Sequence, residues 1–333
     1  NRVDLKDLLH ETLEAEKLRT HLAKRTPLRA FDAEVKRLDG SCYNARLTLS
    51  HFDIDGDPVT QVLVEDHTKE RELEARLQRA EKMEALGTLA GGVAHDLNNI
   101  LSAIVGYPDM LIMDLPADSP MLHSLKAMKQ SGERAAAIVQ DLLTLARRGV
   151  VTSEVVNLNT MVAEYLKTPV FEKVCRFHPD VEVETRLAPD LFNIEGSPVH
   201  LTKTIMNLVS NAAEAITGKG YVTITTENRY VDQPLVGFDR VARGEYATLT
   251  VADTGGGIAP DDLERIFEPF FTKKVMGRSG TGLGMAVVWG TVKDHQGYID
   301  LHSKEGEGTA FTLFFHATRE VAREKVDFDL NAY

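Results

Sequence analysis

The chain has 333 residues, of which 43% are hydrophobic and 26% are charged, and its formal net charge is −12. This composition predicts a soluble globular protein of about two domains with a smaller module, and it excludes a disordered chain. The acidic balance and the lack of any Lys/Arg block argue against nucleic-acid binding. No run of about 18 apolar residues occurs, so we expect no membrane span within this chain.

The cysteines and the start of the chain bear on its location. Cys42 and Cys175 lie far apart and lack metal-ligand spacing, which excludes a disulfide framework or a zinc site. We therefore expect a reducing, cytoplasmic compartment. The opening is charged, lacks Met and has no signal-peptide character, which is typical of a fragment, so a membrane segment upstream in a longer protein stays open.

The first 66 residues predict a helix followed by an antiparallel three-strand meander. Apolar spacing indicates a helix over residues 3–25, and partial alternation of polar and apolar residues indicates strands over residues 30–38, 42–52 and 59–65. Turn signals separate the strands at Asp39 and Gly40 and at residues 55–58. Asp66 or Thr68 then provides an N-cap for a charge-rich helix.

A long helical hairpin follows the meander. Its apolar residues alternate spacings of three and four, as in heptads, along one helix and then, after a loop at residues 114–120, along a second. These positions are Ala90, Val93, Leu97, Ile100, Ile104, Tyr107 and Leu111, then Leu125, Met128, Gly132, Ala135, Val139, Leu142 and Ala146. A second apolar row that includes Leu101 widens the buried face, so two hairpins are expected to form a dimeric four-helix bundle.

One histidine of the first helix has the surroundings of a nucleophile. With Val93 at d and Leu97 at a, His95 takes the outward position f of the heptad. The carboxylate of Asp96 can hold the imidazole in one tautomer, which leaves a lone pair on the other ring nitrogen for attack. Asn99 lies one turn later and can reach the same reacting site. On these residues alone, an ordinary solvated histidine remains the alternative.

From residue 150 a mixed pattern replaces the heptads. It predicts strands at residues 155–158, 181–187, 191–195, 221–230 and 246–252, helices at 159–175, 198–216 and 282–295, and a hairpin at 298–315. Helices and strands segregate without a βαβ rhythm, which indicates an α+β sandwich with a mixed sheet.

Two segments of this region suggest contacts to a nucleotide. Asn207 and Asn211 share one helix face, and their neutral amide oxygens can ligate Mg²⁺ without cancelling its charge. Asp253 begins D-T-G-G-G-I and can accept a hydrogen bond from an exocyclic amine such as that of adenine, while Gly255 and Gly257 let the backbone approach the ring. Surface asparagines and a plain glycine-rich turn are the alternatives.

A second glycine-rich segment opens the helix at residues 282–295. Its glycines free backbone amides to face phosphate oxygens at a helix N-terminus, but it lacks both the P-loop pattern and the strand that a Rossmann site requires. The preceding F-E-P-F-F-T-K-K, residues 267–274, indicates a mobile lid anchored by aromatic residues. Lys273 or Lys274 can reach phosphate there, unless it is only a solvated lysine.

The order of the motifs is more specific than any one of them. H-D-x-N-N, N-x-x-x-N, D-x-G-x-G, F-E-P-F-F and G-T-G-L-G resemble the H, N, G1, F and G2 boxes of the sensor histidine kinases, over roughly residues 68–318. The sequence around H-D-L-N-N resembles the nitrogen-regulation-type and hybrid members. R-L-D-G-S, the strand pair and D-x-T-K-E-R-E-L-E resemble the second half of a PAS sensor domain, for which we expect no bound cofactor; a dimer spacer is the alternative.

The resemblance implies an α+β multidomain chain. Its parts would be a partial PAS β-meander (residues 1–66), a signalling-helix linker (67–82), a dimeric helical-hairpin domain for dimerisation and histidine phosphotransfer (83–149), a GHKL-type α/β sandwich that binds ATP (150–318) and a C-terminal linker (319–333). In a hybrid kinase such a linker would lead to a receiver domain.

Carried over by position, the resemblance makes His95 the phospho-acceptor, Asp96 its acid/base neighbour and Asn99 the residue that dephosphorylates a partner. The implied reaction is autophosphorylation of His95 from ATP and transfer of the phosphoryl group to an aspartate of a response-regulator receiver domain, with phosphatase activity toward that regulator. The implied partners are a second copy of the chain and the receiver domain.

On the nucleotide side, the resemblance makes Asn211 the Mg²⁺ ligand, Asn207 a support for the nucleotide and Asp253 the adenine-binding residue. The other implied ATP contacts are Gly255, Gly257, Lys274, Gly280, Thr281, Gly282, Leu283 and Gly284. Two positions depart from the family: Glu214 stands where many members have a phosphate-binding Lys, and Gly256 stands where Pro is commoner.

Two other functions compete with the kinase. A GHKL-fold ATPase of the gyrase or mismatch-repair kind shares the nucleotide pocket, but such enzymes place a general-base Glu where Asn207 stands, and an amide cannot take a proton. A degenerate kinase acting mainly as a phosphatase is the second alternative, and the intact motifs favour the kinase over it.

Overall fold

The structure is a computed structural model that describes residues 13–36, 42–71, 96–97, 99–116, 118–146, 153–273 and 281–321. The chain separates into two compact units, Asn1–Lys82 and Met83–Tyr333. Within the described ranges, no helix combines the length and the apolar character needed to cross a membrane.

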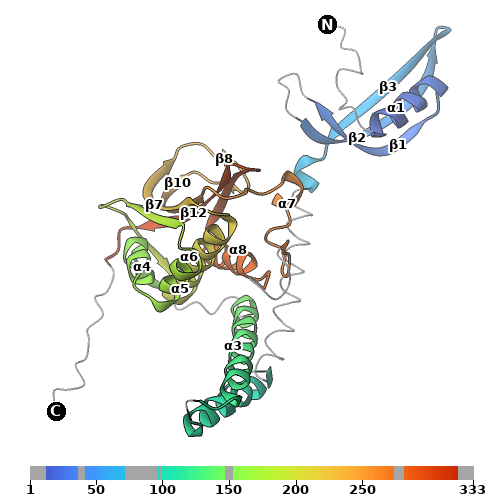
Figure 1. Cartoon of the computed structure of the whole chain (residues 1–333). Coiled ribbons are helices and arrows are strands. Elements are labelled where there is room, and N and C mark those ends of the chain that lie inside the picture. Colours follow the sequence, from blue (N-terminus) through green and yellow to red (C-terminus); the bar gives the residue numbers. More distant parts are fainter. Residues whose placement is uncertain are drawn as a thin grey trace. The chain divides into compact units, whose positions relative to one another are not determined.

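The N-terminal unit is a three-stranded antiparallel sheet with one helix packed against it (Figure 1). Its elements are α1 (Leu13–Lys24), β1 (Leu28–Lys36), β2 (Cys42–Ile54) and β3 (Asp57–Asp66). Leu18 of α1 is buried with Val35 of β1 and Leu47 of β2. The meander is therefore confirmed, and the expected first helix is confirmed over α1, while its earlier residues lie outside the described ranges.

The turns of this unit follow the sequence signals. Asp55 and Gly56 both adopt left-handed φ, 53° and 87°, as a two-residue hairpin turn requires. After β3, the carboxylate of Asp66 accepts the backbone N–H of Thr68 at 3.0 Å, at the start of the helical turn that follows. The expected turn at Asp39 and Gly40 lies outside the described residues.

The second unit begins with a helical hairpin. A helix that includes residues 99–114 packs against α3 (Met121–Ala146) through Leu101 and Val139. The helices approach closely at Gly132, where an added Cβ would lie 2.9 Å from a methyl group of Val105. The main heptad row, Ile100, Ile104, Tyr107 and Leu111, is instead 42–67% exposed. Leu101 of the second apolar row thus contacts α3 of the same chain, and two heptad-row residues take part in this contact: Leu97 packs against the Leu101–Val139 cluster, and a methyl group of Ile104 would lie 3.1 Å from a Cβ at Gly132. The exposed surface of the heptad row remains for another partner.

The rest of the second unit is a seven-stranded mixed sheet with helices on one face (Figure 1). The strand order is β4-β6-β12-β10-β7-β5, with β11 also beside β12, and β5 pairs parallel with β7. The strands are β4 (Glu154–Val156), β5 (Val181–Leu187), β6 (Asn193–Gly196), β7 (Gly220–Val231), β10 (Gly244–Asp253), β11 (Tyr298–Lys304) and β12 (Gly308–Thr318), with a small pair β8 (Leu235–Val236) and β9 (Arg240–Val241). The helices are α4 (Leu158–Tyr165), α5 (Pro169–Phe177), α6 (Pro198–Ala215), α7 (Pro260–Leu263) and α8 (Gly284–Asp294).

The expected α+β sandwich with a mixed sheet is confirmed, but one helix prediction is wrong. The single helix expected over residues 159–175 is two helices, α4 and α5. The side chain of Thr168 accepts the backbone N–H of Phe171 and caps α5, whose first residue is Pro169. Proline lacks the N–H that a continuous helix needs, so the chain starts a new helix there.

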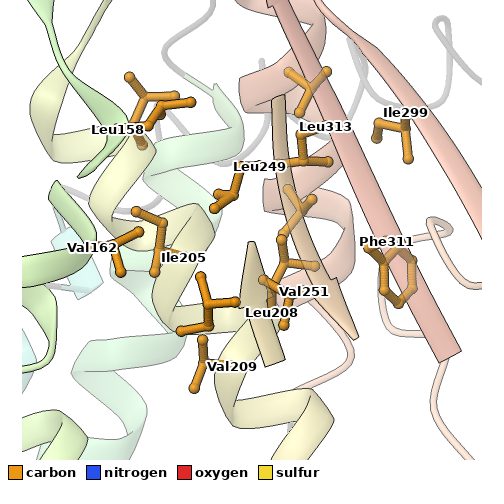
Figure 2. Packing of buried hydrophobic residues seen from close by; sticks show 14 of the residues in the cluster. Leu158, Val162, Ile205, Leu208, Val209, Leu249, Val251, Ile299, Phe311 and Leu313 are labelled. Carbon is orange, nitrogen blue, oxygen red and sulfur yellow. The ribbon is translucent and has the colours of Figure 1, made fainter. Parts of the chain in front are cut away.

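The core lies between α6 and the sheet. Leu249 and Val251 of β10 and Leu313 of β12 pack against residues of α6 such as Ile205 (Figure 2). Alternate residues of a strand face opposite sides of the sheet. Phe314, which follows Leu313, therefore faces the other side, where it packs against Tyr246. Burial of each such aliphatic side chain is worth roughly 1.5–3 kcal/mol. One side of α6 is thereby fixed on the sheet, and the opposite side is left to line a cavity.

Candidate active site

A cavity of about 610 Å³ lies beside α6, the end of β10 and the start of α8. Cavities of about 300–1,000 Å³ are usual for small ligands and cofactors. Its wall contains seven of the expected nucleotide contacts: Asn207, Asn211, Asp253, Gly257, Thr281, Gly282 and Gly284. Segments far apart in the sequence therefore meet at one site, as the order of the motifs leads one to expect.

The helix α6 supplies one side of the cavity. Asn207 donates from Nδ2 to the carbonyl oxygen of Gly284 at 3.2 Å, which leaves its own amide oxygen as an acceptor. Asn211 lies one turn later and makes no side-chain hydrogen bond to any described residue. Glu214, where a lysine is common, also lines the cavity, and Ser210 donates to its carboxylate at 3.4 Å.

The carboxylate of Asp253 closes the end of β10. It accepts the backbone N–H of Gly255 at 2.8 Å. Burial raises the pKa of Asp253, and hydrogen bonds from the backbones of Gly255 and Thr309 offset part of that rise. A Cβ at position 255 would lie 2.6 Å from the carbonyl oxygen of Ala215, so only glycine fits. Gly255 is not in the cavity wall itself; it supports Asp253 from behind.

The entry to α8 forms another part of the cavity wall. Leu283 precedes this helix without a side-chain cap, so first-turn N–H groups point outward, as anion sites at helix N-termini require. The hydroxyl oxygen of Thr281 accepts the backbone N–H of Leu283 at 3.2 Å, and the Leu283 side chain is fully buried. Leu283 therefore anchors the segment and does not line the cavity. Gly280 lies outside the described residues.

The lysine expected over the cavity, Lys274, also lies outside the described residues. Its neighbour Lys273 lines the cavity and pairs with the buried carboxylate of Asp262. Sequence reasoning offered Lys273 as a candidate but did not foresee Asp262, which stands at the first turn of α7. A further unforeseen member of the wall is Asp141 of α3. Only the tertiary structure could identify it, because it comes from the hairpin.

The expected phospho-acceptor region is described in part. His95 lies outside the described residues. Asp96 and Asn99 are both exposed on the first hairpin helix, and neither lines the cavity. An exposed position suits groups that must meet a separate phosphate donor and a separate acceptor protein.

The cavity fits a magnesium nucleotide. Asn211 offers an amide oxygen with no competing described partner, and neutral oxygen ligands suit Mg²⁺. The half-buried carboxylate of Asp253 in the cavity wall suits an amine donor such as that of adenine. The uncapped N-terminus of α8 in the same wall suits phosphate. The three groups together match the three parts of ATP-Mg.

Comparisons with known proteins agree with this site. Residues 196–319 match the family model of the histidine kinase-, DNA gyrase B- and HSP90-like ATPases. The C-terminal sandwich is therefore an ATPase-type domain. Residues 85–149 match the model of the His Kinase A (phospho-acceptor) domain. With both domains in one chain, in this order, the protein belongs to the sensor histidine kinases.

Individual relatives support the same family. The chain is 36% identical over 248 residues to the sensor kinase CckA of Brucella abortus, covering 74% of this chain and 26% of the relative. It is 35% identical over 244 residues to the sensor histidine kinase ZraS of Salmonella typhi, covering 73% and 48%. A crystal structure of full-length ShkA in complex with AMPPNP shares the fold, with a TM-score of 0.55, 22% identity and 69% and 46% of the two chains covered. The chain thus spans less than half the length of each curated relative named here.

Proposed function

We propose that this chain autophosphorylates His95 with ATP-Mg and passes the phosphoryl group to an aspartate of a response-regulator receiver domain. The observation that carries the proposal is the cavity in which Asn211, Asp253 and the uncapped entry to α8 line one space, in a chain that also has a phospho-acceptor hairpin. These residues supply what a nucleotide needs, and the hairpin supplies a nucleophile.

The chemistry follows from the side chains. A ring nitrogen of His95 bonds to the γ-phosphorus while the bond from that phosphorus to the β,γ-bridging oxygen breaks, and ADP leaves. The imidazole N–H proton passes to the carboxylate of Asp96. Mg²⁺ held by Asn211 would offset charge on the phosphates during this transfer. The receiver aspartate then attacks the phosphorus, the P–N bond breaks, and His95 recovers its proton.

Positioning, and not acid–base chemistry at the nucleotide, is the task of the cavity. Asp253 holds the adenine end and the backbone at the start of α8 holds the phosphate end, so the γ-phosphate keeps one orientation. Asn207 provides no proton acceptor for water, which favours transfer to histidine over hydrolysis. Asn99 would orient water for removal of phosphate from the receiver domain.

The hairpin would act as a homodimer. Ile100, Ile104, Tyr107 and Leu111 form a row of exposed apolar residues. Such a row is expected to be buried against another helix pair in a four-helix bundle. A second copy of the chain presents the same row and is the simplest partner.

The test is incubation with γ-labelled ATP and Mg²⁺ of the wild type and the variants His95→Ala, Asn211→Ala and His123→Ala. His123 is an exposed histidine of α3 and serves as the matched control. We expect acid-labile, alkali-stable label on the wild type and on His123→Ala, and none on the other two. Steady release of inorganic phosphate without labelled protein would instead assign the chain to the ATPases that hydrolyse ATP.

The transfer step is tested separately. Labelled protein is freed of ATP and mixed with a panel of purified receiver domains, and loss of label from His95 is followed over time. We expect rapid transfer to a small subset of the panel. An Asn99→Ala variant should still transfer label but lose the ability to remove phosphate from the receiver domain.

A further inference from the structure

One carboxylate of the hairpin forms part of the wall of the nucleotide cavity. Asp141 lies near the C-terminal end of α3 and is only 7% exposed. It lines the same cavity as Asn207 and Asn211 of α6. Removal of a charge from water is strongly unfavourable unless a partner compensates for it. The buried charge of Asp141 therefore needs a neighbour of opposite charge.

That neighbour is Lys203 of α6. Its Nζ lies 2.9 Å from Oδ1 of Asp141, and the two side chains are 27% and 11% exposed. The two groups are close enough for an ion pair but are not aligned for a hydrogen bond, and Oδ1 accepts none from the described residues. The attraction is therefore mainly coulombic. Such an attraction responds to any further charge that enters the cavity.

Lys203 lies on α6 one turn before Asn207; it is outside the cavity wall and reaches the cavity only through its partner Asp141. Lys203, Asn207 and Asn211 follow one another at intervals of four residues on one side of the helix. Besides Asp141, the charged residues in the cavity wall are mostly acidic: Glu214, Asp253, Asp262 and Glu305, against Lys273. In a wall with this excess of carboxylates, neutralisation of Asp141 bears directly on the binding of an anionic polyphosphate.

Apolar contacts flank the ion pair. Ile138 and Leu142 of α3 are partly buried against the core of the ATPase domain. On the other side of α3, Val139 packs against Leu101 of the first hairpin helix. The last turns of α3 thus contact both domains, and Asp141 places a charge in the contact with the ATPase domain. A charge in such a contact makes docking depend on its partner.

We propose that Asp141 and Lys203 are a positioning pair that couples docking of the hairpin on the ATPase domain to occupancy of the nucleotide cavity. The inference rests on the proposed function, in which ATP binds this cavity. When the pair is formed, α3 is held against the domain and the carboxylate is neutralised toward the phosphates. Loss of Lys203 leaves the charge of Asp141 to repel them, whereas loss of Asp141 leaves Lys203 to attract them.

The test is calorimetric binding of Mg·ADP, which avoids turnover, to four proteins: the wild type, Asp141→Asn, Lys203→Gln and the double variant. We expect Lys203→Gln to weaken ADP binding about fivefold and Asp141→Asn to strengthen it about threefold, with the double variant within about twofold of the wild type. Opposite signs for the two partners distinguish an electrostatic role from structural damage, which would weaken binding in both.

A matched control is available within the hairpin. Asp109 pairs with Lys129 at 2.5 Å across the two hairpin helices, outside the cavity wall. Asp109→Asn makes the same chemical change there and should leave ADP affinity unaltered. Hydrogen exchange provides a second readout: amides of residues 138–146 should exchange faster in either single variant, but not in Asp109→Asn.

The outcomes separate the two proposals. Equal weakening by both single variants, or no effect of either in a protein that binds ADP, would overturn the positioning pair and leave the proposed function intact. A wild type that binds no Mg·ADP would overturn the nucleotide site and, with it, the coupling.

Discussion

Two left-handed residues, Phe270 and Gly282, meet beside the nucleotide cavity, and one substitution tests this arrangement. Phe270 and Gly282 have φ of 67° and 69°. The backbone N–H of Phe270 donates to the carbonyl oxygen of Gly282 at 3.0 Å, which joins the two chain segments. In Gly282→Ala, the new Cβ would lie 2.6 Å from the carbonyl carbon and 2.8 Å from the carbonyl oxygen of Phe270. Backbone atoms cannot give way as a flexible side chain does.

The magnitude follows from two contributions. A left-handed alanine costs about 1 kcal/mol, and displacement of the Phe270 backbone adds about 1–2 kcal/mol. The total of about 2–3 kcal/mol falls on the conformation that lines the cavity, so Mg·ADP affinity should drop roughly 30- to 150-fold. Global unfolding in urea should change less, because the segment can shift without exposing the core.

The assay compares calorimetric ADP binding of Gly282→Ala with that of Gly218→Ala. Gly218 also has a left-handed φ, 95°, but a Cβ there meets nothing within 4 Å. Gly218 is outside the cavity wall, so the φ contribution of this control falls on stability and not on the site, and its ADP affinity should match the wild type. If both variants bound ADP equally well, the close packing of Gly282 on Phe270 would have no part in shaping the site.

Three further predictions follow from the same structure. Asp253→Asn should weaken ADP binding at least about tenfold in calorimetry. Burial raises the pKa of Asp253, so the ADP affinity of the wild type should also fall when acidification protonates this carboxyl. The variant should lack this pH dependence. Burial lowers the pKa of His295, and its Nε2 accepts the backbone N–H of Ser197 at 2.9 Å. The unfolded chain therefore takes up the proton first as the pH falls, so the free energy of unfolding should decrease from pH 7 to 5. His295→Gln should flatten this slope in urea titrations. The double variant Tyr107→Asp/Leu111→Asp should sediment as a monomer, because it places charges in the exposed heptad row; a stable dimer would move the interface elsewhere.

Local patterns in the sequence predicted the regular elements well. Strand β5 was expected at residues 181–187 and has those bounds, Val181–Leu187, because its alternation and flanking turns are encoded locally. The sequence also contains a signal for the break between α4 and α5, namely Thr168 as a cap before Pro169. The apolar spacing on either side of this signal instead favours one continuous helix. Capping chemistry, not periodicity, decides that boundary.

The site was predictable where its motifs are local and unpredictable where tertiary contacts create it. Asn207, Asn211 and Asp253 line one cavity. They could be predicted because each stands at a recognisable place on its own helix or strand. Asp141 gives no comparable signal: it is one of many charges on a hairpin helix until that helix packs on the ATPase domain. The left-handed Phe270 is equally hidden, since bulky residues rarely take that conformation.

The two sides of α6 carry a consequence for how this domain can be altered. One side packs on the sheet through residues such as Ile205, and the other presents Lys203, Asn207 and Asn211. Each residue added to a helix rotates everything after it by about 100°. A single insertion within α6 would therefore turn leucines toward the phosphates and asparagines into the core. Redesign of the cavity must proceed by exchange of side chains at constant helix length, and any change of length belongs in the connections before and after this helix.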